Sequence, residues 1–259
     1  MLKIDLNCDL GESFGNYKIG LDEEVISYIS SANVACGFHA SDPLVMEKTV
    51  EMAKKAGVAV GAHPGFPDLV GFGRRNMNVS CPELKSMVLY QLGALDAFCR
   101  KSGIKMQHVK PHGAMYNMAA KDEKMAEAIA EAIAIYDPSI ILLGLSGSQM
   151  LKAGEKVGLV CKKEVFADRA YEEDGSLVSR TKPGAVIQDQ DQAIQRVVDM
   201  VRFGRVKSIS GKEISVEPDS VCVHGDNPKA LDFVVAISNR LKEEGIVISP
   251  MALIESVEK

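Results

Sequence analysis

Short apolar runs alternate with segments of helical periodicity along the whole chain. Two of these runs, VAVGA at residues 58–62 and IILLG at residues 140–144, contain no polar side chain, as in strands that helices cover on both faces. Runs of strand-like length occur at about 2–7, 32–36, 58–62, 104–109, 140–144, 159–166, 220–223 and 246–248. This alternation predicts an α/β protein with a parallel sheet.

The number of strand-like runs predicts how the sheet is arranged. Seven or eight strands that alternate with helices are typical of a (β/α) barrel; the alternative is an open doubly wound sheet, because a strand count does not establish closure. The 259 residues suit one barrel domain, 1–259, and no linker rich in Pro, Gly or Ser divides them. With 46% apolar and 25% charged residues, the chain can form a sizeable core.

Local signals mark several helices and turns. Ser80 and Glu83 match a capping box at the start of a helix predicted over 83–100. The segment 167–218 is irregular, apart from a predicted helix near 189–204 and a hairpin around Gly211. Helix starts or turns are also predicted at Asp42-Pro43, Asp137-Pro138 and Asn227-Pro228.

Charge and hydropathy narrow the class of partners. The formal net charge of −5, without a basic block, argues against nucleic acid and anionic membranes as partners. We expect a cytoplasmic protein, because MLKIDLNCDLGES lacks a signal-peptide pattern and no run approaches the roughly 18 apolar residues of a membrane span. The six cysteines follow no CxxC spacing and are predicted to be reduced core thiols, with a nucleophilic role left open for Cys8, Cys36 and Cys222.

All the histidines share one kind of position, at the end of a predicted strand or in the loop after it. They are His39, His63, His108, His112 and His224. In a barrel the loops after the strands converge on one face and hold the active site. The sequence therefore predicts a shared cleft. Other polar residues at the same kind of position are Asn7, Asp9, Glu12, Asp42, Asp68, Lys110, Glu164, Asp168 and Arg169.

Some of these residues have a simpler structural interpretation. Asp42 is well placed to cap the helix that follows it. Asp9 has no obvious helix to cap, which favours a functional role. Lys110, between His108 and His112, is a candidate for contacting an anionic substrate.

The same strand ends leave a metal site open. Asp9, His39 and His63 follow different strands and could bind a divalent metal that activates water. The chain has no HExxH motif. The three groups could equally form a metal-free cluster of a general base and charged neighbours.

Several long segments, taken together and in order, resemble the LamB/YcsF family over almost the whole chain. They are DLNCDLGES, ANVACGFHASDP, GAHPGFPD, FGRR, VKPHGAMY, EVFADRAY, LVSR and VHGDNP. The resemblance implies a glycoside hydrolase/deacetylase-like barrel. It also implies ATP-dependent opening of the 5-oxoproline (pyroglutamate) lactam to L-glutamate, with ATP as co-substrate and with two further subunits, B and C. It is compatible with a homo-oligomer.

The resemblance carries the family's motif residues onto positions of this chain; their roles, and the addition of Asn7, are our own inference from the residues. Expected catalytic residues are Asp9, His39, His63 and His112. Expected substrate-binding residues are Asn7, Glu12, Asp42, Lys110, Asp168, Arg169, Arg180 and His224. The alternative functions are a metal-dependent deacetylase of amide-bearing sugars and a non-catalytic regulatory subunit. No GxxxxGK[ST] motif occurs, so we expect the chain to need its partners for ATP.

Overall fold

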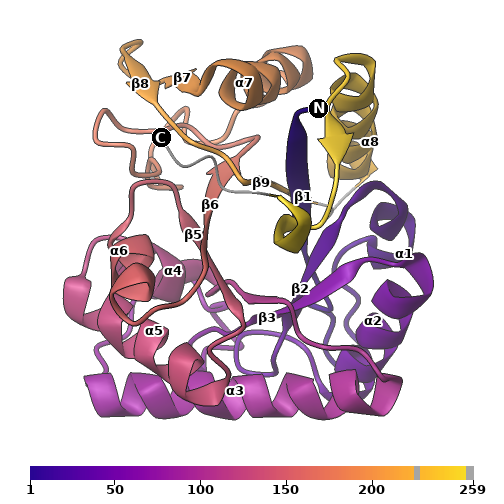
Figure 1. The fold of residues 1–259 in the computed structure, drawn as a ribbon, viewed down its shortest axis with the longest axis vertical. Coiled ribbons are helices and arrows are strands. Elements are labelled where there is room, and N and C mark those ends of the chain that lie inside the picture. Colours follow the sequence, from indigo (N-terminus) through magenta and orange to yellow (C-terminus); the bar gives the residue numbers. More distant parts are fainter. Residues whose placement is uncertain (225–227, 255–259) are drawn as a thin grey trace.

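The computed structural model describes residues 1–224 and 228–254. Seven strands follow one another in parallel around a barrel (Figure 1). They are β1 (Lys3–Leu10), β2 (Ser31–Ala35), β3 (Ala59–His63), β4 (His108–Val109), β5 (Ile141–Leu145), β6 (Cys161–Phe166) and β9 (Ser220–Val223). Each of them lies within or overlaps a strand-like run of the sequence, and the predicted α/β class is confirmed.

Pairing between β9 and β1 closes the barrel. Asp5 of β1 pairs with Ser220 of β9, and β9 also pairs with β6. The open doubly wound alternative is therefore wrong, and the barrel has seven strands. The eighth predicted run forms β10 (Val247–Ile248), which pairs in parallel with the first residues of β1, Lys3 and Ile4.

Helices surround the strands (Figure 1). They are α1 (Asp22–Val25), η1 (Ile26–Tyr28), α2 (Pro43–Ala56), α3 (Cys81–Ser102), α4 (Gly113–Ala119), α5 (Glu123–Tyr136), α6 (Gln149–Lys156), α7 (Gln190–Phe203), α8 (Pro228–Glu243) and η2 (Met251–Leu253). The predicted hairpin around Gly211 is the antiparallel pair β7 (Arg205–Lys207) and β8 (Glu213–Ser215).

Capping explains where two of the helices begin. Ser80 and Glu83 form the predicted capping box of α3, and the Asp42 carboxylate accepts hydrogen bonds from two backbone N–H groups at the start of α2. Asp137 instead follows α5, and its carboxylate accepts hydrogen bonds from Ser139 in a turn. Asn227 lies outside the described residues.

The barrel interior below the pocket is polar. Asp5, Asn7 and Ser220 are fully buried there, and the Asp5 carboxylate accepts hydrogen bonds from Ser30, Ser31 and Ser220. Burial raises the pKa of Asp5 to about 6, although these hydrogen bonds oppose the rise. The hydrogen bonds satisfy groups whose burial would otherwise be costly.

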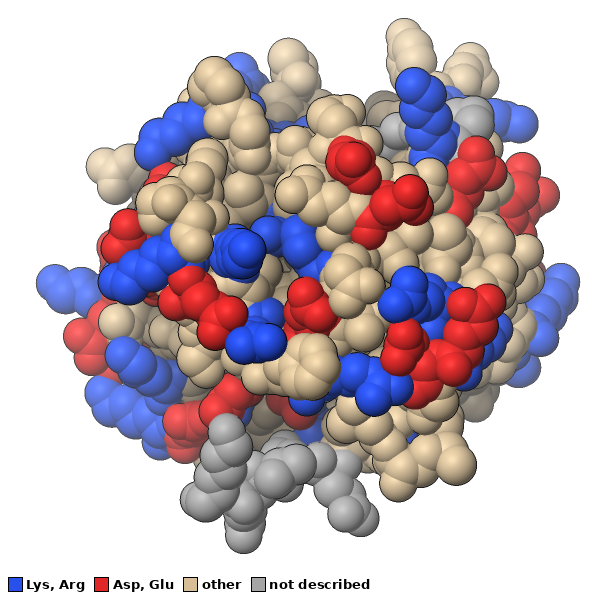
Figure 2. Space-filling model, turned by 90° about the horizontal axis from the view of Figure 1, so that it is seen from above, with Lys and Arg blue, Asp and Glu red and all other residues tan. Residues whose placement is uncertain are grey.

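Apolar side chains from β1 to α8 form one large cluster around this interior. Every cysteine is a free thiol, and burial raises the pKa of Cys8, Cys36 and Cys222, which keeps these thiols protonated. Among residues 1–224 and 228–254, no helix combines the length and apolar character of a bilayer span. On the face shown in Figure 2, acidic and basic side chains are interspersed.

Candidate active site

A cavity of about 690 Å³ opens at the carboxyl ends of the strands. Asp9 of β1, His63 at the end of β3, and Lys110 and His112 after β4 line it, together with His224 after β9. The structure thus brings together ionisable groups from four strand ends, where barrel enzymes carry their active sites.

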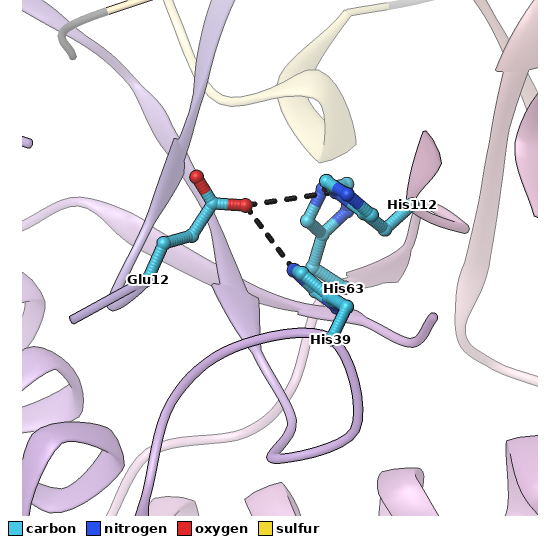
Figure 3. A group of neighbouring side chains, drawn as sticks. All are labelled: Glu12, His39, His63 and His112. Atoms are coloured by element: carbon cyan, nitrogen blue, oxygen red, sulfur yellow. Dashed lines mark hydrogen bonds and ion pairs between the residues drawn. The ribbon is translucent and has the colours of Figure 1, made fainter. Parts of the chain in front are cut away.

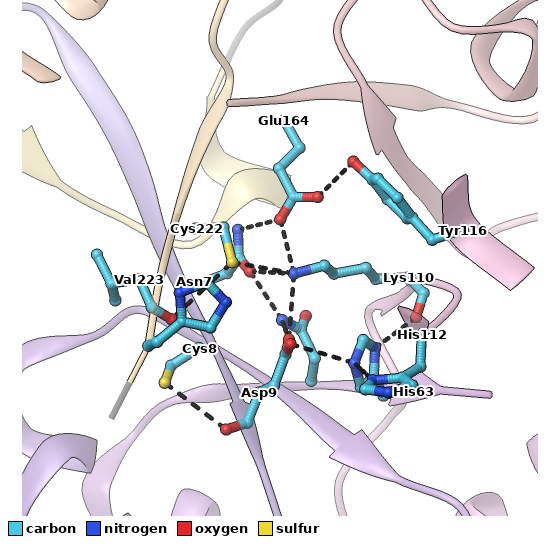
Figure 4. Close-up of polar contacts among 12 residues, drawn as sticks. Asn7, Cys8, Asp9, His63, Lys110, His112, Tyr116, Glu164, Cys222 and Val223 are labelled. Carbon is cyan, nitrogen blue, oxygen red and sulfur yellow. Dashed lines mark hydrogen bonds and ion pairs between the residues drawn. The ribbon is translucent and has the colours of Figure 1, made fainter. Parts of the chain in front are cut away.

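Lys110 lies at the centre of a buried network (Figure 4). Its ammonium donates hydrogen bonds to Asp9 Oδ1 at 3.1 Å and Asn7 Oδ1 at 3.2 Å, and it lies 2.8 Å from Glu164 Oε1. Burial alone would lower the pKa of Lys110, but the charges of Asp9 and Glu164 outweigh it and hold this pKa well above the usual value. Lys110 is therefore a fixed positive charge between two carboxylates.

Asp9 faces both this network and the histidines. Asn33 Nδ2 donates to Asp9 Oδ1 at 2.8 Å, and His63 Nε2 lies 3.3 Å from Asp9 Oδ2. Burial raises the pKa of Asp9, yet the nearby ammonium of Lys110 helps to bring it well below the usual value. The side chain is 17% exposed, so an ionised carboxylate meets the cavity.

Three histidines and Glu12 form a compact group beside Asp9 (Figure 3). Glu12 Oε1 lies 3.1 Å from His39 Nε2 and 3.6 Å from His112 Nδ1. His63 Nε2 and His112 Nδ1 are 2.9 Å apart, and the His39 and His112 rings stack with centroids 3.7 Å apart. The sequence grouped Asp9 with His39 and His63; in the structure Asp9 contacts His63, and Glu12 contacts His39 and His112.

These four residues form one of two sets of ligand atoms in the described part of the chain that lie close enough to share a metal ion. In each set all the ligand atoms are within 4.8 Å of one another. The second set consists of Asp9, Cys222 and His224.

His224 and Asp168 form a separate pair at the cavity wall. Their Nδ1 and Oδ2 atoms are 3.0 Å apart, and the side chains are 21% and 18% exposed. Burial lowers the pKa of His224, but the Asp168 carboxylate outweighs it and raises this pKa above 6.5. The pKa of Asp168 falls to about 2, because the charge of His224 outweighs the effect of burial.

Other predicted site residues lie away from the cavity surface. Asn7 is buried and donates hydrogen bonds to Glu164 and Ser220. Asp42 caps α2 and also accepts a hydrogen bond from the Gly15 backbone N–H. His108 is buried inside the barrel, where its Nε2 contacts Asn33, and burial lowers its pKa to about 3.

The two predicted arginines differ in how free they are. Arg180 lines the cavity and is exposed. Arg169 also lines it, but its guanidinium donates to the backbone oxygens of Val178 and Ala185, and burial lowers its pKa to about 10. Arg180 is the freer cation for an incoming anion.

Two site residues were missing from the predicted set. Asn33 bridges Asn7 and Asp9, and the Tyr116 hydroxyl donates to Glu164 Oε2 at 2.6 Å. An amide within the run of small residues that forms β2 was a usable signal for Asn33. Tyr116 carried no such signal, because an aromatic residue in α4 reads equally well as core.

The closed parallel barrel, with its ionisable cavity at the carboxyl ends of the strands, defines a (β/α)-barrel protein of the enzyme type. More particularly, the chain belongs to the LamB/YcsF family, whose model matches residues 4–256.

Named relatives resemble the chain over nearly its full length. It is 67% identical to a Clostridium beijerinckii protein named as the A subunit of 5-oxoprolinase, over 97% of this chain and 98% of the relative. It is 54% identical to the protein of the same name from Bacillus subtilis, over 97% and 98% of the two chains.

Solved structures agree with the fold. The lactam utilization protein from Thermus thermophilus superposes with a TM-score of 0.91 at 44% identity, over 96% of this chain and 99% of that one. A T48 deacetylase with substrate reaches a TM-score of 0.51 at 12% identity, over 97% and 89% of the two chains, and shows the shared deacetylase-like fold alone.

Proposed function

We propose that this chain is the A subunit of an ATP-dependent 5-oxoprolinase, which opens the lactam of 5-oxoproline to L-glutamate together with subunits B and C. The observation that carries the proposal is the 67% identity, over nearly the full length of both chains, to a relative that bears the name of this subunit. The ionisable cavity at the strand ends supports a catalytic rather than a regulatory subunit.

The chemistry needs activation from outside the chain. A lactam carbonyl is a poor electrophile, so ATP is proposed to phosphorylate the amide oxygen. ADP is released, water attacks the activated carbon, and the ring C–N bond breaks to leave an acyl phosphate. A second water hydrolyses this acyl phosphate to L-glutamate and phosphate. In this scheme the chain contributes the groups that orient water, stabilise charge and transfer protons.

The three candidates for activating water, Asp9, His39 and His63, differ in how far their side chains are exposed. The side chain of Asp9 is 17% exposed, whereas those of His39 and His63 are 0% and 1% exposed. Asp9 is therefore the group that can meet a water molecule in the cavity. Its low pKa suits a carboxylate that orients water and stabilises positive charge.

Proton transfer is assigned to His224. Its pKa is raised from 6.5 by Asp168, so it carries a proton over more of the neutral range, and it lines the cavity. We propose that it donates this proton to the ring nitrogen as the C–N bond breaks. Arg180 is proposed to bind the substrate carboxylate or the phosphate.

Reconstitution tests the proposal. The purified chain, subunits B and C, and all combinations are assayed for glutamate formed from 5-oxoproline and ATP, and in parallel for acetate released from acetylated amino sugars. Glutamate is expected only when all three subunits are present. Acetate release by this chain alone, without glutamate from the full set, would favour the deacetylase alternative.

A further inference from the structure

A backbone carbonyl fixes which nitrogen of His63 carries a proton. His63 Nδ1 lies 2.7 Å from the carbonyl oxygen of Lys110. A carbonyl oxygen only accepts hydrogen bonds, so Nδ1 carries the proton and donates it. In the neutral ring, Nε2 is then left with a lone pair that points into the group of Glu12 and the histidines.

His112 is fixed in the complementary way. Its Nε2 lies 2.8 Å from the carbonyl oxygen of Phe72, so Nε2 is the donor and Nδ1 has the lone pair. Phe72 adopts a φ of 54°, a left-handed conformation that is unfavourable for an aromatic residue. The chain thus accepts backbone strain at the residue whose carbonyl orients His112.

The lone pairs of His63 Nε2 and His112 Nδ1 lie next to each other. His63 Nε2 and His112 Nδ1 are 2.9 Å apart, and Asp9 Oδ2 lies 3.3 Å from the same His63 nitrogen. Three acceptors at these distances repel one another unless a cation or a shared proton lies among them. Glu12 Oε1, 3.6 Å from His112 Nδ1, adds a fourth acceptor.

We propose that His39, His63, His112 and Glu12 bind a divalent transition-metal ion of the zinc type. Three imidazoles and a carboxylate match the ligands that zinc takes in proteins. Two nitrogen atoms 2.9 Å apart can both lie about 2.0–2.1 Å from one ion. Metal-bound histidines usually donate their other N–H to a backbone carbonyl or carboxylate, as His63 and His112 do here.

The second set of close ligand atoms is a poorer metal site. Lys110 Nζ lies 3.1 Å from Asp9 Oδ1 and 3.2 Å from Cys222 Sγ. A metal ion beside Asp9 and Cys222 would be repelled by this ammonium. The group around Glu12 is therefore the site we assign, and the assignment does not depend on the proposed function.

Metal content tests the inference directly. The full chain is purified without chelator and analysed by mass spectrometry for metals, then stripped, dialysed and titrated with Zn²⁺ by calorimetry. We expect one Zn²⁺ per chain. At a free Zn²⁺ concentration of about a hundred times the Kd, the Tm should rise by about 5 to 10 °C.

Variants locate the site. His112→Asn and Glu12→Gln should weaken Zn²⁺ binding by more than about a hundredfold, since loss of partners outside the ligand set alone costs about 10- to 100-fold. His224→Asn is the matched control, because this histidine lines the same cavity outside the proposed group, and it should keep one Zn²⁺ per chain. Circular dichroism of each metal-free variant establishes that it is folded.

Two results would overturn the inference. One is a folded wild-type chain that binds no Zn²⁺ and whose Tm is unchanged by it, which would mean that a shared proton holds His63 and His112 together. The other is binding that His224→Asn abolishes and His112→Asn preserves.

Discussion

The buried ammonium of Lys110 forms ion pairs with two carboxylates, those of Asp9 and Glu164. We expect Lys110→Met to lower the free energy of unfolding by about 3 to 5 kcal/mol, because it leaves Asp9 and Glu164 as unpaired buried charges. Denaturant unfolding followed by circular dichroism measures the change. Lys163→Met is the control: its pair with Glu217 is solvent-exposed, so the loss should stay below about 1 kcal/mol. Equal losses in the two variants would contradict this account.

Asp9 allows a test of catalysis by a single charge. Asp9→Asn keeps the size of the side chain and removes its charge, and we expect kcat of the reconstituted enzyme to fall by at least about a hundredfold. Asp137→Asn, in the turn after α5, serves as the control and should leave the rate unchanged. If Asp9→Asn slows turnover tenfold or less while the subunits stay bound to one another, Asp9 has a structural role.

The pair of His224 and Asp168 gives a pH prediction. In Asp168→Asn the charge that raises the pKa of His224 is gone, so burial dominates and this pKa moves down. A group that donates a proton acts only below its pKa. The alkaline limb of the profile of kcat/KM against pH should therefore move to lower pH in the variant. An unmoved limb in the reconstituted complex would assign proton donation to another group.

At the scale of elements, the loop that contains Phe72 and Gly73 shapes the histidine group. Gly73 has a φ of +64°, and a Cβ there would lie 2.7 Å from His39 Cβ and 2.8 Å from His112 Cδ2. Gly73→Ala should therefore destabilise the fold by about 1 to 3 kcal/mol. Gly93→Ala, in α3 with open space around it, should stabilise the fold by about 0.5 to 1 kcal/mol. Thermal unfolding of both variants checks the opposite signs, and a neutral Gly73→Ala would contradict the packing described.

The elements themselves were largely readable from the sequence, because each strand and helix leaves a local periodic signal. The sequence indicated less clearly how deep in the barrel each residue of β1 lies. Asp5, Asn7 and Asp9 alternate onto the inner face, yet only Asp9 is near enough to the strand's end to line the cavity. Asn7 was expected to bind substrate, and the structure places it below Asp9, buried and outside the lining of the cavity.

The composition of the histidine group was not readable in the same way. Asp9 lies near the end of β1 and Glu12 lies just after it. Which of the two carboxylates contacts His39 depends on how the backbone turns after Leu10. The carbonyls of Phe72 and Lys110 that orient the imidazoles carry no sequence signal at all, because every residue has one. Such contacts depend on tertiary structure.

At the scale of the whole molecule, the question is whether this chain binds ATP by itself or needs subunits B and C for it. The cavity offers Arg180 for an anion, but the chain has no P-loop motif. We expect calorimetry of this chain alone with Mg-ATP to show no binding with a Kd below about 1 mM, which corresponds to about −4.1 kcal/mol. Binding should become measurable when subunits B and C are added. Tight ATP binding, or glutamate formation, by the isolated chain would contradict the proposed division.

The closure of the barrel also sets when the pocket can form during synthesis. Asp5 of β1 meets Ser220 of β9, 215 residues further along the chain. Until β9 has left the ribosome, the first strand has an unpaired edge, and pairing over such a separation is slow because a long loop must close first. Asp9 and His224 therefore come together only late in translation, and the nascent chain is expected to be inactive until then.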